Sequence, residues 1–60
     1  MKTYYRIPYG GNASIEVRRD GAAVLRMYCG HKTEVRRCAS ETSAKRTLSR
    51  WTDGLYKRVG

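Results

Sequence analysis

Residues 14–28, with the sequence SIEVRRDGAAVLRMY, have the pattern of two strands joined by a turn, which is the clearest structural signal in the chain. Apolar and polar side chains alternate on both sides of Asp20-Gly21, as in half-buried strands. A two-residue loop there would pair Ile15 with Arg26 and mix the two surfaces of the hairpin. A three-residue loop, with Gly21 in the left-handed conformation, keeps the apolar residues on one face. These residues are Ile15, Val17, Leu25 and Met27.

Two further turn signals, Gly10-Gly11-Asn12 and Gly30-His31-Lys32, extend this hairpin into a meander. Three-residue loops at both positions align Ile7 with Ile15, and Met27 with Val35. Strands are therefore expected near residues 3–9, 13–19, 22–29 and 33–38. Pro8 restricts the first of them to an edge position or to a place outside the sheet. The expected apolar face holds odd-numbered residues: Tyr5, Ile7, Tyr9, Ala13, Ile15, Val17, Ala23, Leu25, Met27, Cys29, Thr33 and Val35.

After Ala39 the apolar period changes from two to that of a helix. Ser40 is the expected N-cap, and Glu41 in the first turn suits the helix dipole. The helix is expected to run from about Glu41 to Arg58. An end near Asp53 stays open as the alternative, because Gly54 costs about 1 kcal/mol in a helix relative to Ala. The apolar stripe is Ala44, Leu48, Trp51, Leu55 and Val59, with Trp51 expected as the central core contact.

Together these elements predict an α+β fold, in which a three- or four-stranded antiparallel meander packs on one C-terminal helix. Residues 1–60 are expected to form a single small basic domain. A chain of this length buries about 60% of its unfolded surface, so one sheet-to-helix contact is all the core that it can build. The 40% of hydrophobic residues suffices for a modest core and argues against disorder.

The net charge of the chain indicates which class of molecule it binds. The formal net charge is +8, and nine of the 13 basic residues are arginine, whose planar fork suits phosphates and guanine edges. A polyanion is therefore the expected partner. The alternative interpretation is that the charge only keeps a small domain in solution.

If the helix covers the odd-numbered face, the even-numbered face of the sheet is open. Cross-strand neighbours on it would then include Arg26 beside Arg36, a like-charge pair that a bound anion would relieve. Such a face can lie in the major groove of duplex DNA or offer tyrosines for stacking to single strands, and the excess of arginine favours the first. The expected open-face residues are Tyr4, Arg6, Ser14, Glu16, Arg18, Val24, Arg26, Tyr28, Glu34 and Arg36.

The pattern of Ser14 to Gly21, Val24 to Tyr28, Ser43 to Arg46 and Leu48 to Trp51 resembles the strand, turn, strand and helix order of AP2-like and integrase arm-type DNA-binding domains. The resemblance covers residues 13–53 and rests on periodicity and one turn. It implies that the open sheet face reads the major groove through Arg18, Arg26, Tyr28 and Arg36. The outline is also similar to single-strand-binding coactivator and PUR-type repeats, which usually dimerise, so a homodimer is left open.

The sequence therefore predicts a non-enzymatic nucleic-acid-binding module, with DNA favoured over RNA. Basic residues off the helix stripe form a second surface that can hold flanking phosphates. The alternative is a small interaction or inhibitor module, of the size common in phages, that docks an acidic protein. The expected nucleic-acid contacts are Arg6, Arg18, Arg26, Tyr28, Lys32, Arg36, Lys45, Arg46 and Arg50.

Catalytic, metal-binding and membrane roles find little support in the sequence. Cys29, His31 and Cys38 supply three donors at awkward spacing with no usual fourth ligand, so neither a metal nor another cofactor is expected. A ribonuclease that uses His31 would need a second acid or base, and none is evident. The segment after Met1 lacks an apolar signal core, so a cytoplasmic location with free thiols and no membrane contact is expected.

Overall fold

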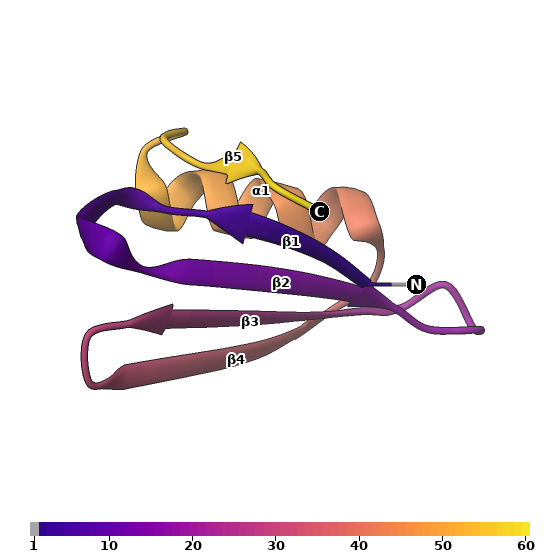
Figure 1. The fold of residues 1–60 in the computed structure, drawn as a ribbon. Helices are drawn as coiled ribbons and strands as arrows, with labels where there is room; N and C mark the ends of the chain where they lie inside the picture. Colours follow the sequence, from indigo (N-terminus) through magenta and orange to yellow (C-terminus); the bar gives the residue numbers. More distant parts are fainter. Residues whose placement is uncertain (1) are drawn as a thin grey trace.

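The computed structural model describes residues 2–60, with the side chain of Tyr9 excepted, so the expected place of Tyr9 on the apolar face lies outside the described residues. It shows an antiparallel sheet and one helix that packs on it (Figure 1), which confirms the α+β meander. The sheet has five strands in the order β4-β3-β2-β1-β5. The elements in chain order are β1 (Lys2–Arg6), a 3-10 turn (Pro8–Gly10), β2 (Asn12–Val17), β3 (Ala23–Cys29), β4 (Lys32–Cys38), α1 (Glu41–Thr52) and β5 (Lys57–Arg58).

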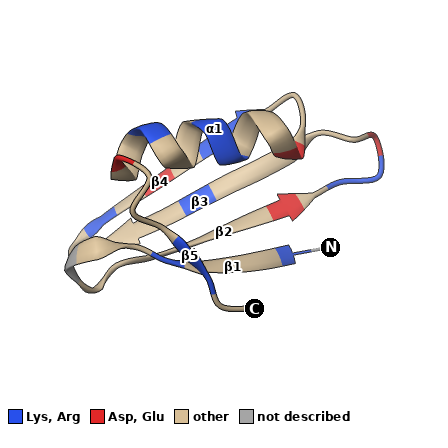
Figure 2. Ribbon diagram, turned by 90° about the horizontal axis from the view of Figure 1, so that it is seen from above, with Lys and Arg blue, Asp and Glu red and all other residues tan. Residues whose placement is uncertain are grey.

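Helix α1 lies across one face of the sheet and leaves the other face open (Figures 1 and 2). The core lies between these two layers. Its largest fully buried side chains are Ile15, Leu25 and Leu48, from β2, β3 and α1. Because one helix must cover the sheet, the core is a single layer contact, as the chain length requires. The other buried members of the cluster are Tyr5, Ile7, Ala13, Ala23, Cys38 and Ala44.

The β2–β3 hairpin has the predicted register. Ile15 lies opposite Leu25, and Val17 lies opposite Ala23. Gly21 has a φ of 90°, and the backbone N–H of Gly21 donates to Arg18 O at 3.0 Å. Asp20 Oδ1 accepts a hydrogen bond from the N–H of Ala22 at 3.0 Å, which is a local bond that Asp commonly makes in turns.

The predicted β3–β4 register is wrong, because the connecting turn has two residues rather than three. Cys29 pairs with Lys32 across Gly30-His31, so Met27 faces Glu34 instead of Val35. Gly30 has a φ of 63° while φ of His31 is negative, as in a type II′ turn with glycine at its first central position. A shift of one residue exchanges the two faces of a strand. Thr33 and Val35, both expected on the apolar face, are therefore on the open face.

The β1–β2 register is also displaced. Thr3, not Ile7, lies opposite Ile15, because the chain leaves the sheet after Arg6 and makes the 3-10 turn at Pro8–Gly10. Pro8 is thus outside the sheet, which is one of the two places expected for it. Gly11 allows this turn to lie close to β3, since a Cβ on Gly11 would come within 2.6 Å of the Tyr28 carbonyl oxygen.

Helix α1 begins as predicted and ends at the earlier of the two expected positions. Ser40 Oγ accepts a hydrogen bond from the N–H of Ser43 at 3.2 Å, and Glu41 occupies the first turn. Thr52 is the last helical residue, and Asp53 caps the end with a φ of 53°. The chain then returns to the sheet as β5, a strand that the sequence did not predict. β5 pairs antiparallel with β1, Arg58 lying opposite Tyr5.

Four residues expected in the core lie further out. Trp51 is only partly buried at the side of the core, so it is not the central contact. Cys29 is exposed next to the β3–β4 turn. Leu55 and Val59 are exposed because the helix has ended before them. Cys38 moves the other way and is buried, since the two-residue turn directs it toward α1.

Candidate nucleic-acid interface

Charged and aromatic side chains gather on the face of the sheet opposite α1, and we call this face the open face. Directly opposed residues of antiparallel strands share a face, so the strand pairings define its members as three rows that cross the sheet. The first row is Thr33, Tyr28, Asn12, Arg6 and Lys57; the second is Val35, Arg26, Ser14 and Tyr4; the third is Arg37, Val24, Glu16 and Lys2.

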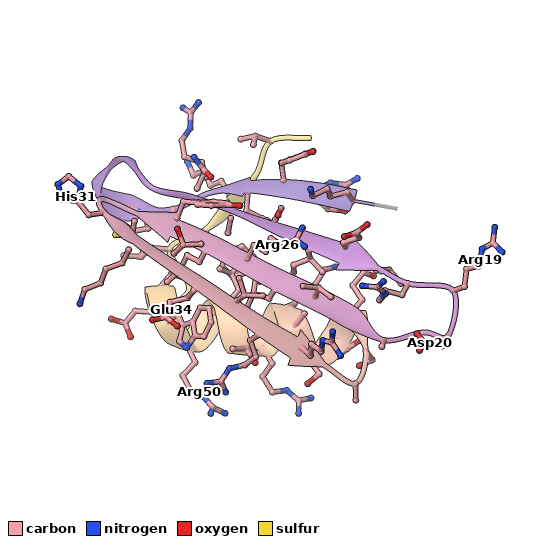
Figure 3. All side chains as sticks on the ribbon, turned by 90° about the horizontal axis from the view of Figure 1, so that it is seen from below. Arg19, Asp20, Arg26, His31, Glu34 and Arg50 are labelled. Atoms are coloured by element: carbon pink, nitrogen blue, oxygen red, sulfur yellow. The ribbon has the colours of Figure 1, made fainter. Side chains whose placement is uncertain are left out.

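The open face is strongly basic. Among the described residues that form these three rows, five are basic and come from four different strands, and one, Glu16, is acidic. Arg26 Nη1 lies 3.7 Å from Glu16 Oε1, a partly exposed ion pair near the centre of the face, where Figure 3 shows Arg26. An exposed pair of this kind contributes little to stability. The five basic residues are Lys2, Arg6, Arg26, Arg37 and Lys57.

Arg6 and Lys57 lie directly opposite each other on β1 and β5. Like charges in this arrangement repel, and no acidic residue shares their row on the open face. The like-charge pair expected at Arg26 and Arg36 does not exist, because Arg26 faces Val35. The opposed like charges on the open face therefore lie on β1 and β5, and not on β3 and β4 as the sequence predicted.

Two tyrosines and one valine give the open face its apolar area. The side chains of Tyr4, Tyr28 and Val35 are 50%, 43% and 58% exposed. Lys2 Nζ lies 5.7 Å from the centroid of the Tyr4 ring. Half-exposed aromatic rings between cations can stack with bases, whose faces all carry π electrons.

Arg36, predicted on the open face, lies on the helix side of β4. Its guanidinium carbon is 5.5 Å from the centroid of the Trp51 ring. Glu34, also expected on the open face, shares this side, because both residues alternate with Val35. Lys32 pairs with Cys29 and is on the helix side as well. Neither Arg36 nor Lys32 can therefore contact a ligand that lies flat on the open face.

Arg18 and Arg37 line one hollow at the end of the sheet that carries the β2–β3 turn. Asp20, Ala22, Ala23 and Val24 line it too. Figure 3 shows Arg19 and Asp20 at this end and His31 at the opposite end. Arg18 thus lies beside the open face and shares this hollow with Arg37.

The basic residues of α1 form a separate surface. Lys45, Arg46 and Arg50 are exposed on the helix, which covers the other face of the sheet (Figure 2). In Figure 3 the helix lies behind the sheet, and Arg50 points past the outer side of β4. A ligand flat on the open face contacts Arg6, Arg26 and Tyr28 but not Lys45 or Arg46.

The sequence prediction assigned none of Lys2, Arg37 and Lys57 to the open face, and the helix expected to run to Arg58 placed Lys57 on the helix instead. A two-residue turn at Gly30-His31 would have placed Arg37 on the open face. Glycine at the first central position of a hairpin loop is a recognised signal for such a turn. Lys2 has the same parity as Tyr4 and Arg6, so a longer first strand would have included it. Lys57 had no signal, because β5 has only two residues.

Other titratable groups are dispersed. Among residues 2–60, no three His, Cys, Asp or Glu side chains gather closely enough to hold a metal ion. Cys29 and Cys38 are both free thiols.

Burial raises the pKa of the Tyr5 phenol, and the carboxylate of Glu41 raises it further. In the same described region, no helix has the length and apolar character needed to cross a membrane.

Comparison of the chain with protein-family models, with curated proteins and with solved structures gave no match.

Proposed function

We propose that this protein is a non-enzymatic DNA-binding module whose open face contacts the sugar-phosphate backbone. The support comes from the side chains themselves: five cations, two half-exposed tyrosines and a single carboxylate share one surface. The proposal places the protein in the cytoplasm, where DNA is accessible in cells without a nucleus and the exposed Cys29 thiol stays reduced.

The observation that carries the proposal is the opposition of Arg6 and Lys57. The sheet places two cations side by side with no carboxylate in their row, which costs stability in the free protein. A phosphate over this pair converts the repulsion into two favourable contacts. Arg18 and Arg37 line one hollow at the other end of the sheet, but Asp20 lines it as well, so the charge crowding is weaker there.

The width of the sheet indicates how DNA would lie on it. Adjacent strands are about 4.8 Å apart, so the outermost of five strands are separated by roughly 19 Å. The major groove is only about 12 Å wide and admits a two-stranded ribbon. The open face therefore spans the phosphates on both sides of a groove, or holds a single strand along Tyr4 and Tyr28, instead of entering the groove as a whole.

The test is a titration of nuclease-treated protein with a labelled duplex and a labelled single strand of the same sequence, at several salt concentrations. Release of counterions by five cations predicts a slope of log K against log salt of about −4.5 for duplex and about −3.5 for single-stranded DNA. The form with the higher affinity identifies the binding mode. Absence of binding to either form at low salt would overturn the proposal.

An acidic protein partner would give a different result in the same experiment. Such a partner should compete with DNA for the open face, and it should still be captured from a nuclease-treated lysate. If the chain captured an acidic protein but did not bind DNA, the open face would be a protein-binding surface instead.

A further inference from the structure

The outer edge of the sheet is a long strand with no neighbour. β4 has seven residues, and the strand order places it at one end of the sheet. Its side chains from Lys32 to Arg37 are all exposed. Within residues 2–60 its outer N–H and C=O groups face no other strand. Such an edge is a template for pairing with another chain.

β4 lacks several features that commonly prevent edge pairing. It contains no proline, and its register with β3 runs without a bulge from Lys32 to Cys38. It is also not short, unlike β5 at the other edge, which has two residues. What remains as protection is charge, because four of its seven residues are ionised. The order of these charges decides which partner the edge accepts.

The charges of β4 are complementary to those of a second copy of the same strand. A twofold axis through Val35 pairs residues whose numbers sum to 70, so each Glu34 lies opposite Arg36 of the other copy. Val35 then lies opposite Val35, and Thr33 lies opposite Arg37. This register uses the whole strand. Moving the axis to position 34 or 36 would oppose two glutamates or two arginines, which repel.

We propose that two copies of this chain associate through antiparallel pairing of β4 about Val35. The twofold axis is perpendicular to the sheet, so both open faces continue on one side and both helices lie on the other. Val35, 58% exposed in the single chain, would be partly covered by its counterpart. The two Glu34–Arg36 pairs form on the helix side of the combined sheet.

One of the two side chains that make these pairs, Arg36, already has a contact within the single chain. Arg36 packs over the Trp51 ring at 5.5 Å, which restricts its guanidinium before any partner arrives. Glu34, Arg36, Met27 and Trp51 line one shallow hollow beside β4. A side chain of the second copy can enter this hollow from the edge. Because the net charge of each copy is +8, the repulsion between copies makes the dimer a weak one.

This inference does not depend on DNA binding. A single chain can bind DNA through the open face without pairing, and the edge can pair without DNA. If both occur, the combined open face has twofold symmetry and doubles the number of cations that one DNA molecule contacts.

The test reverses the charges at positions 34 and 36 of β4, one at a time. Glu34→Arg gives a chain with two cations at positions 34 and 36, and Arg36→Glu gives a chain with two anions. We expect nuclease-treated wild type to dimerise in sedimentation equilibrium at about 0.15 M salt. Each variant alone should have a dimer dissociation constant raised at least about tenfold, because two attractive pairs become repulsive. An equimolar mixture of the two variants should form heterodimers.

Two controls separate edge pairing from loss of fold and from net charge. The double variant E34R/R36E reverses both charges in one chain and should dimerise like the wild type. Lys45→Glu changes the net charge as much as Arg36→Glu does, but on α1, and should leave association intact. A wild type that stays monomeric at the highest attainable concentration would overturn the proposal. So would a mixture of the two single variants that does not associate.

Discussion

Arg36 and Arg37 are consecutive residues whose side chains lie on opposite sides of the sheet. The guanidinium carbon of Arg36 lies 5.5 Å from the Trp51 ring centroid, on the helix side. Arg37 lies opposite Val24 on the open face and lines the hollow beside Arg18. Strand alternation alone thus gives two neighbouring arginines different roles, one in packing and one on the candidate DNA surface.

Arg36→Ala should lower the free energy of unfolding by about 1 kcal/mol, because the substitution removes the cation–π contact of the Arg36 guanidinium with Trp51. Urea denaturation monitored by Trp51 fluorescence measures this. Arg37→Ala is the matched comparison and should change stability by less than about 0.5 kcal/mol. Equal losses in the two variants would contradict the packing role of Arg36.

Glu16→Gln should strengthen DNA binding about fivefold at moderate salt. The change removes the one carboxylate of the open face and releases Arg26, whose Nη1 lies 3.7 Å from Glu16 Oε1. A pair of exposed charges at this distance is worth about 1 kcal/mol, which corresponds to that factor. Fluorescence anisotropy with a labelled duplex gives the affinity. Asp53→Asn removes a carboxylate at the end of α1, where asparagine tolerates the positive φ, and should have a smaller effect, which makes it the control.

Gly11→Ala should destabilise the fold by roughly 1–3 kcal/mol. A Cβ at this position would lie 2.6 Å from the Tyr28 carbonyl oxygen and 2.8 Å from Ile7 Cδ1, so the turn before β2 would have to move away from β3. Thermal unfolding followed by circular dichroism tests this. At Gly10, where no atom lies within 4 Å of such a Cβ, Gly10→Asn should cost less, because asparagine tolerates a positive φ.

Tyr5 should make stability depend on alkaline pH. Burial raises the pKa of its phenol in the folded state, and Glu41 adds to the shift. The unfolded chain therefore loses this proton first, so the contribution of Tyr5 is constant below about pH 10 and is lost as the pH rises through its folded pKa. Urea unfolding of wild type and Tyr5→Phe at several pH values should show a shallower decline in the variant. Identical declines would contradict this assignment.

Local signals were sufficient to predict the centre of the fold. Asp20-Gly21 between two alternating segments determines the β2–β3 register, and Ser40 with Glu41 determines the start of α1. In both places the side chain that gives the signal makes the local contact itself. Asp20 accepts from the N–H of Ala22, and Ser40 accepts from the N–H of Ser43. Such contacts need no information from distant parts of the chain.

Other elements depend on choices that the sequence leaves open. Glycine at position 30 is compatible with a loop of two residues or of three. This difference of one residue in loop length decides whether Arg36 or Arg37 lies on the open face. β5 has no pattern of its own. It forms because α1 ends at Asp53 and the chain returns beside β1, where the N–H of Val59 donates to Tyr4 O at 2.9 Å. Lys57 could therefore be assigned to the open face only from tertiary structure.

Under the proposed function the open face, and not the helix, binds DNA. This assignment is tested by the slope of log K against log salt for the double variants Arg26→Ala/Arg37→Ala and Lys45→Ala/Arg46→Ala, with the duplex used for the wild type. The slope should become less steep by about 1.8 for the open-face variant, because two phosphate contacts are lost, and should stay unchanged for the helix variant. An unchanged slope in the open-face variant, with a reduced slope in the helix variant, would show that the helix and not the open face contacts the DNA.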